Sequence, residues 1–170
     1  MMREPSPPGP STVSSRAGLT EALFAEIYPG LRRFAGAISA PVVDADDLVQ
    51  EACVRYMRRS GSEPVFNIGA YLRRSILNLE LTRRTTEQRR EHVRARLIEP
   101  ESTEPNYPSD LAELMALDPV DRALIYLTAV EHWTFAEAAE LLERPEAALR
   151  MRATRARRLL RDGIERRDDG

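Results

Sequence analysis

The sequence contains no lysine and only one cysteine. All 25 basic residues are arginine, whose planar guanidinium suits two-pronged contacts with phosphates and guanine edges. Cys53 has no second cysteine to pair with, which excludes a disulfide within this sequence. Its place in an apolar helical pattern indicates a small core residue in a reducing compartment. We therefore expect a cytoplasmic protein.

Signatures of catalysis, metal binding and membrane insertion are also missing. His92 and His132 lie far apart and have no cysteine or serine partner in a motif, and one cysteine with two histidines gives no zinc pattern. The sequence has no glycine-rich phosphate loop, no apolar run long enough to span a membrane and no apolar signal core at its start. We expect no enzyme activity, no metal or other cofactor and no membrane insertion.

Charge is strongly segregated along the 170 residues, although the net charge is only −2. Residues 70–96 carry 8 Arg against 3 Glu, and residues 144–161 carry 7 Arg against 1 Glu. Between these basic blocks, residues 97–143 carry 1 Arg against 11 acidic residues. The pattern predicts polyanion binding at two separate places. The alternative is that both basic blocks are solvated helix faces neutralised by the acidic middle.

Helical spacing of apolar residues dominates the first half. A helix is predicted from the N-cap Thr20 to about Ile38, with Pro29 kinking or splitting it. A second helix begins at Asp44, and a third, capped by Asn67, continues toward residue 96. The second helix places four acidic groups near its positive end, and alone it would indicate only a well-capped core helix.

The second half begins after a segment that cannot be a continuous helix. Residues 97–109 contain three Pro and three Glu. Further on, Asp118 precedes a proline at the first helical position, and Thr134 with Glu137 forms a capping box. A last helix is predicted from Glu146 to about residue 164, and Trp133 is expected to cover a helix seam while staying partly exposed.

These patterns predict an all-α protein of two small helical domains joined by a flexible linker. The predicted divisions are a disordered tail at 1–18, a first domain at 19–96, an acidic proline-rich linker at 97–109, a second domain at 110–165 and a tail at 166–170.

Three stretches carry a resemblance to a known family. They read DADDLVQEACVRYMRR, AYLRRSILNLELTRR and LDPVDRALIYLTAVEHWTFAEAAELL, the last followed by an arginine-rich helix. Over about residues 19–164 the sequence resembles bacterial RNA polymerase sigma factors of the extracytoplasmic-function group of the sigma-70 family. The resemblance implies a region 2 bundle, a region 4 helix-turn-helix, and core RNA polymerase and promoter DNA as partners. An anti-sigma factor is left open as a further partner.

The resemblance also implies roles for particular residues of the first domain. The residues expected to dock on core polymerase are Asp46, Asp47, Leu48, Val49, Gln50 and Glu51. Those expected to hold the unpaired downstream promoter element are Phe66, Tyr71, Arg74, Asn78, Arg83 and Arg84. Tyr71 stands where the family usually has Trp, but an aromatic ring beside arginine still suits the stacking of unpaired bases.

The last helix is the predicted recognition helix. At 100° per residue its core face holds Leu149, Ala153, Ala156 and Leu160. The residues expected to meet the upstream promoter element are Ala148, Arg150, Met151, Arg152, Arg155 and Arg158. The family usually has hydroxyls where Ala148 and Met151 stand, and glycine where Glu143 stands. We therefore expect electrostatic and weakly sequence-specific contacts.

Two other functions fit the same residues. An autonomous helix-turn-helix regulator would bind specific duplex DNA without polymerase. A degenerate module would bind polymerase or an anti-sigma partner without reading a promoter, which the altered recognition helix favours. A sigma factor that binds core polymerase and directs promoter recognition and opening is the function we expect.

Overall fold

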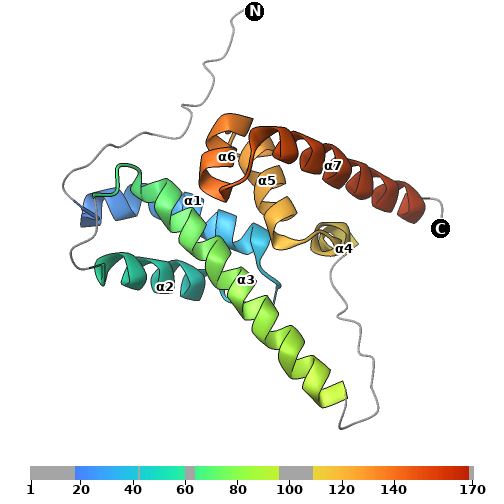
Figure 1. The fold of residues 1–170 in the computed structure, drawn as a ribbon, viewed down its shortest axis with the longest axis horizontal. Coiled ribbons are helices and arrows are strands. Elements are labelled where there is room, and N and C mark those ends of the chain that lie inside the picture. Colours follow the sequence, from blue (N-terminus) through green and yellow to red (C-terminus); the bar gives the residue numbers. More distant parts are fainter. Residues whose placement is uncertain (1–17, 42, 60–63, 96–108, 169–170) are drawn as a thin grey trace, which may run out of the picture.

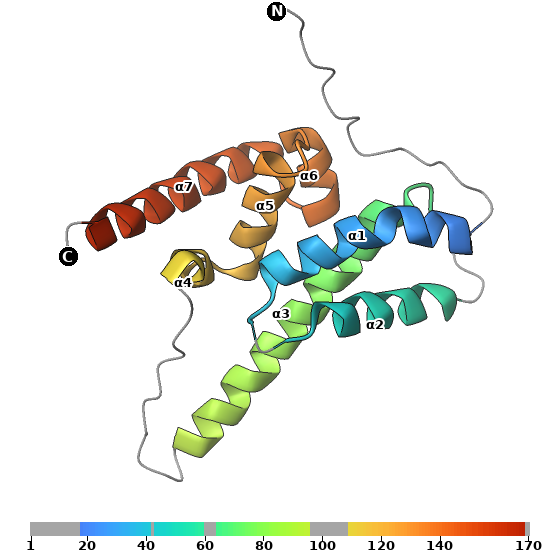
Figure 2. The same ribbon diagram turned by 180° about the vertical axis from the view of Figure 1, so that it is seen from behind.

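Seven helices make up the computed structural model over the residues it describes, which are 18–41, 43–59, 64–95 and 109–168. The first half of the chain forms three of them: α1 (Glu21–Ile38), α2 (Ala45–Met57) and α3 (Ile68–Ala95). The second half forms the other four: α4 (Ser109–Ala116), α5 (Pro119–Ala129), α6 (Phe135–Leu142) and α7 (Glu146–Asp168). The predicted all-α fold is confirmed, and Figures 1 and 2 show it from opposite sides.

Local sequence signals place the starts of the first three helices. Thr20 caps α1 by accepting the amide of the third helical residue at 3.2 Å. Asn67 accepts the amide three residues later at 2.9 Å and so starts α3. Asp44 caps α2, as predicted, but it accepts the amide of Asp46 at 2.8 Å rather than that of Asp47. Each side chain satisfies an amide that has no partner within the helix.

Pro29 lies inside α1, which continues through it as one helix. The expectation of a split at this position is therefore wrong. Proline removes one backbone hydrogen bond, whereas Leu31, Phe34 and Ile38 on the following turns are all 0% exposed. Burial of these three side chains stabilises the part of α1 that follows the proline.

The second half follows its predicted caps. Asp118 accepts the amide of Asp121 at 2.9 Å, and the capping box of Thr134 and Glu137 has both of its hydrogen bonds. Two boundaries differ from the prediction. Helix α4 already starts at Ser109, which had been assigned to the linker, and α7 runs to Asp168 through much of the predicted C-terminal tail. Residues 1–17 of the predicted tail and residues 97–108 of the predicted linker lie outside the described residues.

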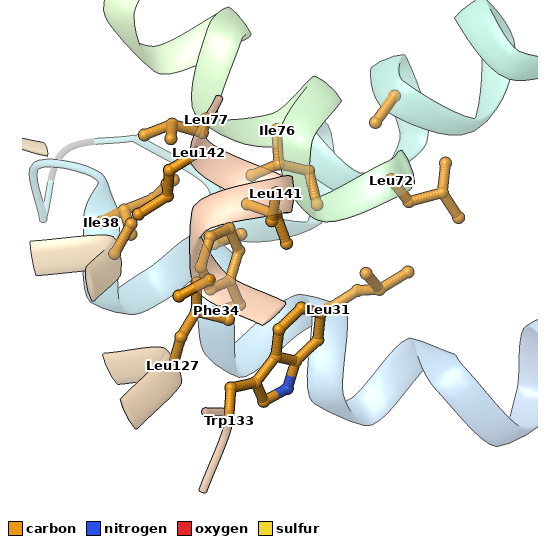
Figure 3. Close-up of a cluster of buried hydrophobic side chains, with 14 of the residues drawn as sticks. Leu31, Phe34, Ile38, Leu72, Ile76, Leu77, Leu127, Trp133, Leu141 and Leu142 are labelled. Atoms are coloured by element: carbon orange, nitrogen blue, oxygen red, sulfur yellow. The ribbon is translucent and has the colours of Figure 1, made fainter. Parts of the chain in front are cut away.

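The two halves share one hydrophobic core. Helix α5 packs on α1 and on α3, and α6 packs on α3, as both ribbon views show. Figure 3 shows the side chains where they meet, which come from both halves: Leu31, Phe34, Ile38, Leu72, Ile76, Leu77, Leu127, Trp133, Leu141 and Leu142. The two predicted domains are therefore packed against each other in this structure.

A buried arginine joins the halves at the end of α1. Arg122 of α5 is 4% exposed and donates from Nε to the carbonyl oxygen of Ile38 at 3.1 Å, with a second bond from Nη2 to the same oxygen. It also donates to the carbonyl of Leu117 at 2.8 Å. The last carbonyls of a helix lack helical partners and carry partial negative charge. Arg122 therefore caps α1 from the other half of the chain.

Trp133 is more deeply placed than the sequence suggested. Its side chain is 7% exposed, so the expectation of partial exposure is wrong. It lies between α1 and the second half in Figure 3, and the guanidinium carbon of Arg73 is 5.7 Å from its ring centre. Packing between the halves, which no local pattern encodes, covers this side chain.

Candidate functional site

The exposed face of α2 contains three of the six residues expected to dock on polymerase. Asp47, Gln50 and Glu51 are exposed. Leu48 and Val49 are 4% and 0% exposed and pack in the core, so they cannot touch a partner in this structure. This corrects their predicted role, because on a helix one side of the DLVQE segment must face inward. Leu48 and Val49 instead hold the polar face outward.

Asp46 is engaged mainly within the protein. Its Oδ1 accepts a hydrogen bond from the hydroxyl of Tyr28 at 2.6 Å and another from Nε of Arg32 at 2.9 Å. The hydrogen bond from Tyr28, followed by the charge of Arg32, lowers the pKa of the Asp46 carboxyl. Asp46 thus fastens α2 to α1, although 34% of its side chain remains exposed.

A groove runs between α2 and α3 beside this polar face. It encloses about 570 Å³, and its lining includes Asp47, Gln50 and Glu51 from α2 and Thr82 and Arg83 from α3. Arg83 was predicted to contact DNA, but the structure places it on the groove with the α2 carboxylates. Opposite charges on the two walls make this groove a polar docking surface.

The start of α3 presents the aromatic residues expected to hold unpaired bases. Phe66 is 72% exposed just before the helix. Tyr71 packs edge-on against Tyr56, with ring centres 5.6 Å apart, and the guanidinium carbon of Arg59 lies 4.9 Å from the Tyr71 ring centre. Two rings and an arginine therefore meet at one place, the combination that unpaired bases require.

Arg74 and Asn78, the next predicted DNA residues on α3, lie where α3 meets α6. Arg74 forms an ion pair with Glu143, and both Arg74 and Asn78 line a cavity between α3 and the end of α6. Arg84, further along α3, is exposed and away from this seam. The structure therefore separates the predicted set into a group at the seam, Arg83 in the groove and Arg84 on the outer part of α3.

The predicted recognition helix α7 has the expected orientation. Leu149 and Ala153 are 0% exposed and Ala156 is 1% exposed, so the calculated core face is confirmed at these three positions, whereas Leu160 is only half-buried. Met151 is 69% exposed on the outer face. The other predicted contact residues exposed there are Ala148, Arg150, Arg155 and Arg158. This outer face thus carries methyl groups and a thioether among three exposed guanidinium groups.

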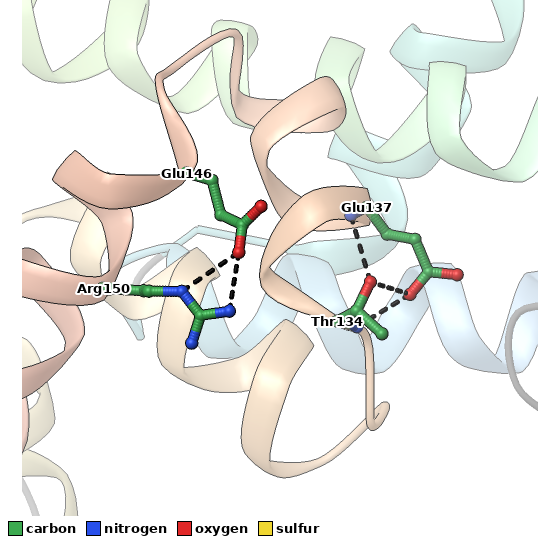
Figure 4. Close-up of polar contacts among 4 residues, drawn as sticks. All are labelled: Thr134, Glu137, Glu146 and Arg150. Atoms are coloured by element: carbon green, nitrogen blue, oxygen red, sulfur yellow. Dashed lines mark hydrogen bonds and ion pairs between the residues drawn. The ribbon is translucent and has the colours of Figure 1, made fainter.

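Arg150 is held at the start of α7. It donates to Oε1 of Glu146 from Nη2 at 2.6 Å and from Nε at 3.0 Å, as Figure 4 shows. Its guanidinium carbon lies 4.7 Å from the ring centre of Phe135 in α6. The guanidinium is therefore fixed against both helices of the helix-turn-helix, yet 60% of its side chain is exposed.

Arg152 has a structural role instead of the predicted DNA contact. It donates to Asp121 from Nε and to Asp118 from Nη2, both at 2.7 Å. Despite partial burial, the amide of Asp121 and the charge of Arg152 lower the pKa of Asp118. Burial, followed by the charge of Asp118, raises the pKa of Asp121. Arg152 thus ties α7 to the capped start of α5.

Glu143, which replaces the family's usual glycine, ends α6 in the left-handed conformation, with φ 51° and ψ 46°. A side chain in that region costs roughly 1–2 kcal/mol relative to glycine. The predicted turn therefore forms with the backbone geometry that glycine would supply.

Sequence reasoning missed the buried charges between the halves. Arg73 donates to Glu131 at 2.7 Å, and their side chains are only 13% and 14% exposed. Glu80 is 5% exposed, and burial raises its pKa, although nearby Arg122 and Arg83 oppose the shift. Glu80 continues the core spacing of Leu72 and Ile76, so a charge on the apolar stripe was a readable signal. No pattern in the sequence indicated the pair of Arg73 and Glu131.

Two negative findings apply to the described residues only. No group of three or more His, Cys, Asp or Glu side chains there is placed to hold a metal ion. None of the helices in the described ranges is both long and apolar enough to cross a membrane.

Comparison with known proteins agrees with this geometry. A helix-turn-helix beside a second helical half with its own basic surface defines a DNA-binding protein of transcription. A family model described as sigma-70 region 2 matches residues 23–90, and one described as sigma-70, region 4 matches residues 111–160. The chain belongs to the sigma-70 family of RNA polymerase sigma factors. This family is non-enzymatic in general.

A solved structure shares the fold. It is the sigma factor RpoE from Bartonella quintana, crystallised in complex with the anti-sigma factor NepR. The match covers 85% of this chain and 96% of that chain, with 21% sequence identity and a TM-score of 0.66. A search of curated protein sequences found no match.

Proposed function

We propose that this chain binds core RNA polymerase and directs it to promoters, where it helps to open the duplex. The observation that carries the proposal is the presence of both sigma-70 regions in one chain, each with its own basic surface. One region alone would support DNA or polymerase binding, but initiation requires that both be joined. The alternative of an autonomous helix-turn-helix regulator leaves the region 2 half without a task.

The polar face of α2 is the proposed contact with polymerase. Asp47, Gln50 and Glu51 project from it, and Glu51 pairs with Arg55 on the same helix, at 2.9 Å. These groups are solvated and line a groove, so a partner that offers hydrogen-bond donors there can replace their contacts with water. Asp46 supports this face through α1 rather than forming its centre.

Promoter DNA has two proposed sites. Phe66, Tyr71, Arg74 and Asn78 would hold unpaired bases and their backbone, because they combine exposed or stacked rings with an arginine and an amide. The outer face of α7 would enter the major groove of the upstream element. Its arginines attract phosphates regardless of sequence, whereas Ala148 and Met151 offer only apolar contacts, so discrimination between upstream sequences should be weak.

The proposed function needs no chemistry from this chain. Polymerase forms the phosphodiester bonds, and the sigma factor supplies binding and orientation. We accordingly propose no catalytic residue and no cofactor, and we place the protein in the cytoplasm with polymerase and DNA. An anti-sigma factor is a further proposed partner, supported by the fold shared with a sigma factor that was crystallised with one.

Reconstitution tests the proposal. Purified protein is mixed with core polymerase, and transcripts are mapped across genomic DNA with and without the sigma factor. We expect a stable complex and a defined set of new transcript starts. The double variant Asp47→Ala/Gln50→Ala should weaken the complex. Glu26→Ala, which changes an exposed residue of α1, should not.

The same experiment separates the two alternative functions. Specific duplex binding without polymerase, together with no complex, would indicate an autonomous regulator. A stable complex that starts no promoter-dependent transcript would indicate a module that binds polymerase without reading DNA.

A further inference from the structure

Part of the proposed single-strand surface of α3 is covered by the other half of the chain, whereas Phe66 stays exposed. A cavity of about 310 Å³ lies at the seam between α3 and α6. Its α3 wall includes Asn67, Tyr71 and Arg74, and its opposite wall includes Glu137 and Glu140. Residues with the chemistry to hold unpaired bases therefore face carboxylates of the same chain across a narrow space.

Ion pairs connect α3 with the second half of the chain beside this cavity. Arg74 pairs with Glu143 at the end of α6. Beside it, Arg73 pairs with Glu131, and this pair is almost fully buried. Carboxylates thus stand beside two successive α3 arginines, where DNA phosphates would compete for the same guanidinium groups. A strand of DNA and α6 cannot both occupy this surface.

The conformation of Glu143 indicates that its side chain matters here. Glycine would form the left-handed turn at no steric cost, yet the chain has Glu143 with φ 51°. Its carboxylate pairs with Arg74 of the other half. The contact offsets the backbone cost only while the halves are together, because Arg74 belongs to α3.

We propose that α6 is an intramolecular cover over the single-strand surface of α3, and that Glu143 latches it through Arg74. In the free protein the shared core and the carboxylate of Glu143 together hold the surface closed. The surface becomes fully available when α6 leaves α3, which also releases Arg74 from Glu143. The identity of the covered surface rests on the proposed function, whereas the latch itself rests only on the contacts between α3 and α6.

The latch is tested without DNA. Trp133, the single tryptophan, is 7% exposed and lines the same cavity, so its quenching by acrylamide reports separation of α6 from α3. In Glu143→Arg two arginines repel across the seam, and we expect Trp133 to be quenched more strongly than in the wild type. The charge swap Arg74→Glu/Glu143→Arg restores opposite charges and should return quenching to the wild-type value. Because it keeps the same substitution at position 143, the recovery would be due to charge.

Equal quenching in the wild type and in Glu143→Arg would overturn the latch. So would a charge swap that is quenched as strongly as Glu143→Arg, because a merely damaged turn would behave in that way. Circular dichroism of each variant checks that the helices persist.

Binding of DNA tests the cover. Glu143→Gln keeps the shape of the side chain but removes its charge, so a labelled pool of single-stranded oligonucleotides should bind about two- to fivefold more tightly than to the wild type. Glu26→Gln is the matched control, because it also removes one exposed carboxylate, but on α1 and away from the residues that line the seam.

Equal gains in the two glutamine variants would show only a change in net charge and would overturn the cover. A latch confirmed by quenching, with no gain for either variant, would instead refute the assignment of single-strand binding to α3. The failure of the cover and the failure of the proposed function are therefore distinguishable.

Discussion

Arg152 and Arg155 lie three residues apart on α7 but meet different surroundings. Arg152 is clamped between Asp118 and Asp121, both at 2.7 Å. Arg155 is exposed, and it forms no ion pair among the residues that the structure describes. From the sequence both were assigned to DNA, because helical periodicity gives the direction of a side chain but not the charge of the neighbouring helix. The structure separates a stabilising arginine from a binding one.

Substitution of these two arginines should give opposite results. Arg152→Ala leaves Asp118 and Asp121 repelling each other, so the free energy of unfolding should fall by about 1 kcal/mol. Arg155→Ala should change stability by less than about 0.5 kcal/mol. It should lower the affinity of the sigma–polymerase complex for promoter DNA and reduce the salt slope by about 1. Urea denaturation and salt-dependent binding measure both, and identical profiles would contradict the division of roles.

Glu80 should make stability depend on pH. Burial raises the pKa of its carboxyl in the folded state, against the opposing charges of Arg122, Arg83 and Arg84. A raised folded pKa means that the folded state binds the proton more tightly, so this contribution is complete below the unfolded pKa and is lost as pH rises through the folded pKa. Glu80→Gln resembles the protonated form but cannot titrate.

The free energy of unfolding of Glu80→Gln, relative to the wild type, should therefore increase from about pH 4 upward and level off above the folded pKa. Urea denaturation at a series of pH values measures it. The difference between the proteins isolates Glu80 from other titrating groups, and a difference that stays constant with pH would refute the assignment.

At the scale of a helix, α2 combines two tasks on its two sides. Leu48 and Val49 pack inward, and Asp47 and Gln50 point to solvent. Sequence reasoning found the helix and its cap because both depend on neighbouring residues. It extended the family role across the whole DLVQE segment, although a helix can offer only one side to a partner. The burial of each position had to come from the structure.

A pair of variants separates these tasks. Leu48→Ala opens a cavity in the core and should lower the free energy of unfolding by about 2–5 kcal/mol. Gln50→Ala should change stability by less than about 0.5 kcal/mol, because its side chain is exposed and alanine favours a helix. It should nevertheless weaken binding to core polymerase. Thermal unfolding and a binding titration provide the two measurements, and unchanged affinity in Gln50→Ala would remove it from the interface.

At the scale of the molecule, the sequence predicted the helices of each half better than the relation between the halves. Caps and apolar stripes are local, so caps such as Thr20, Asn67 and Asp118 predicted helix starts that the structure shows. The contact of α5 with α1 depends on groups far apart in the chain, such as Arg122 and the carbonyl of Ile38. No period or motif links those positions. A proline-rich segment between two patterns was consistent with separate domains, and only the structure reveals a common core.

Because the core is common, the two halves should unfold together. Trp133 lies at their junction, packed near Leu31 and Phe34 of α1, and its fluorescence reports the junction alone. Circular dichroism at the same time reports helices throughout the chain. We expect the two signals to change with the same urea midpoint, since separation of the halves would expose Leu31, Phe34 and Leu127, each fully buried.

Leu127→Ala provides the matched test, because it removes apolar surface at the junction. It should lower the free energy of unfolding by about 2–5 kcal/mol. Both urea midpoints should therefore move together to a lower urea concentration. If instead Trp133 became exposed at a lower urea concentration than the loss of helix, the halves would be separate cooperative units that dock weakly. The junction would then contribute little to the folding of either half, and the closed arrangement would depend mainly on the polar contacts between α3 and α6.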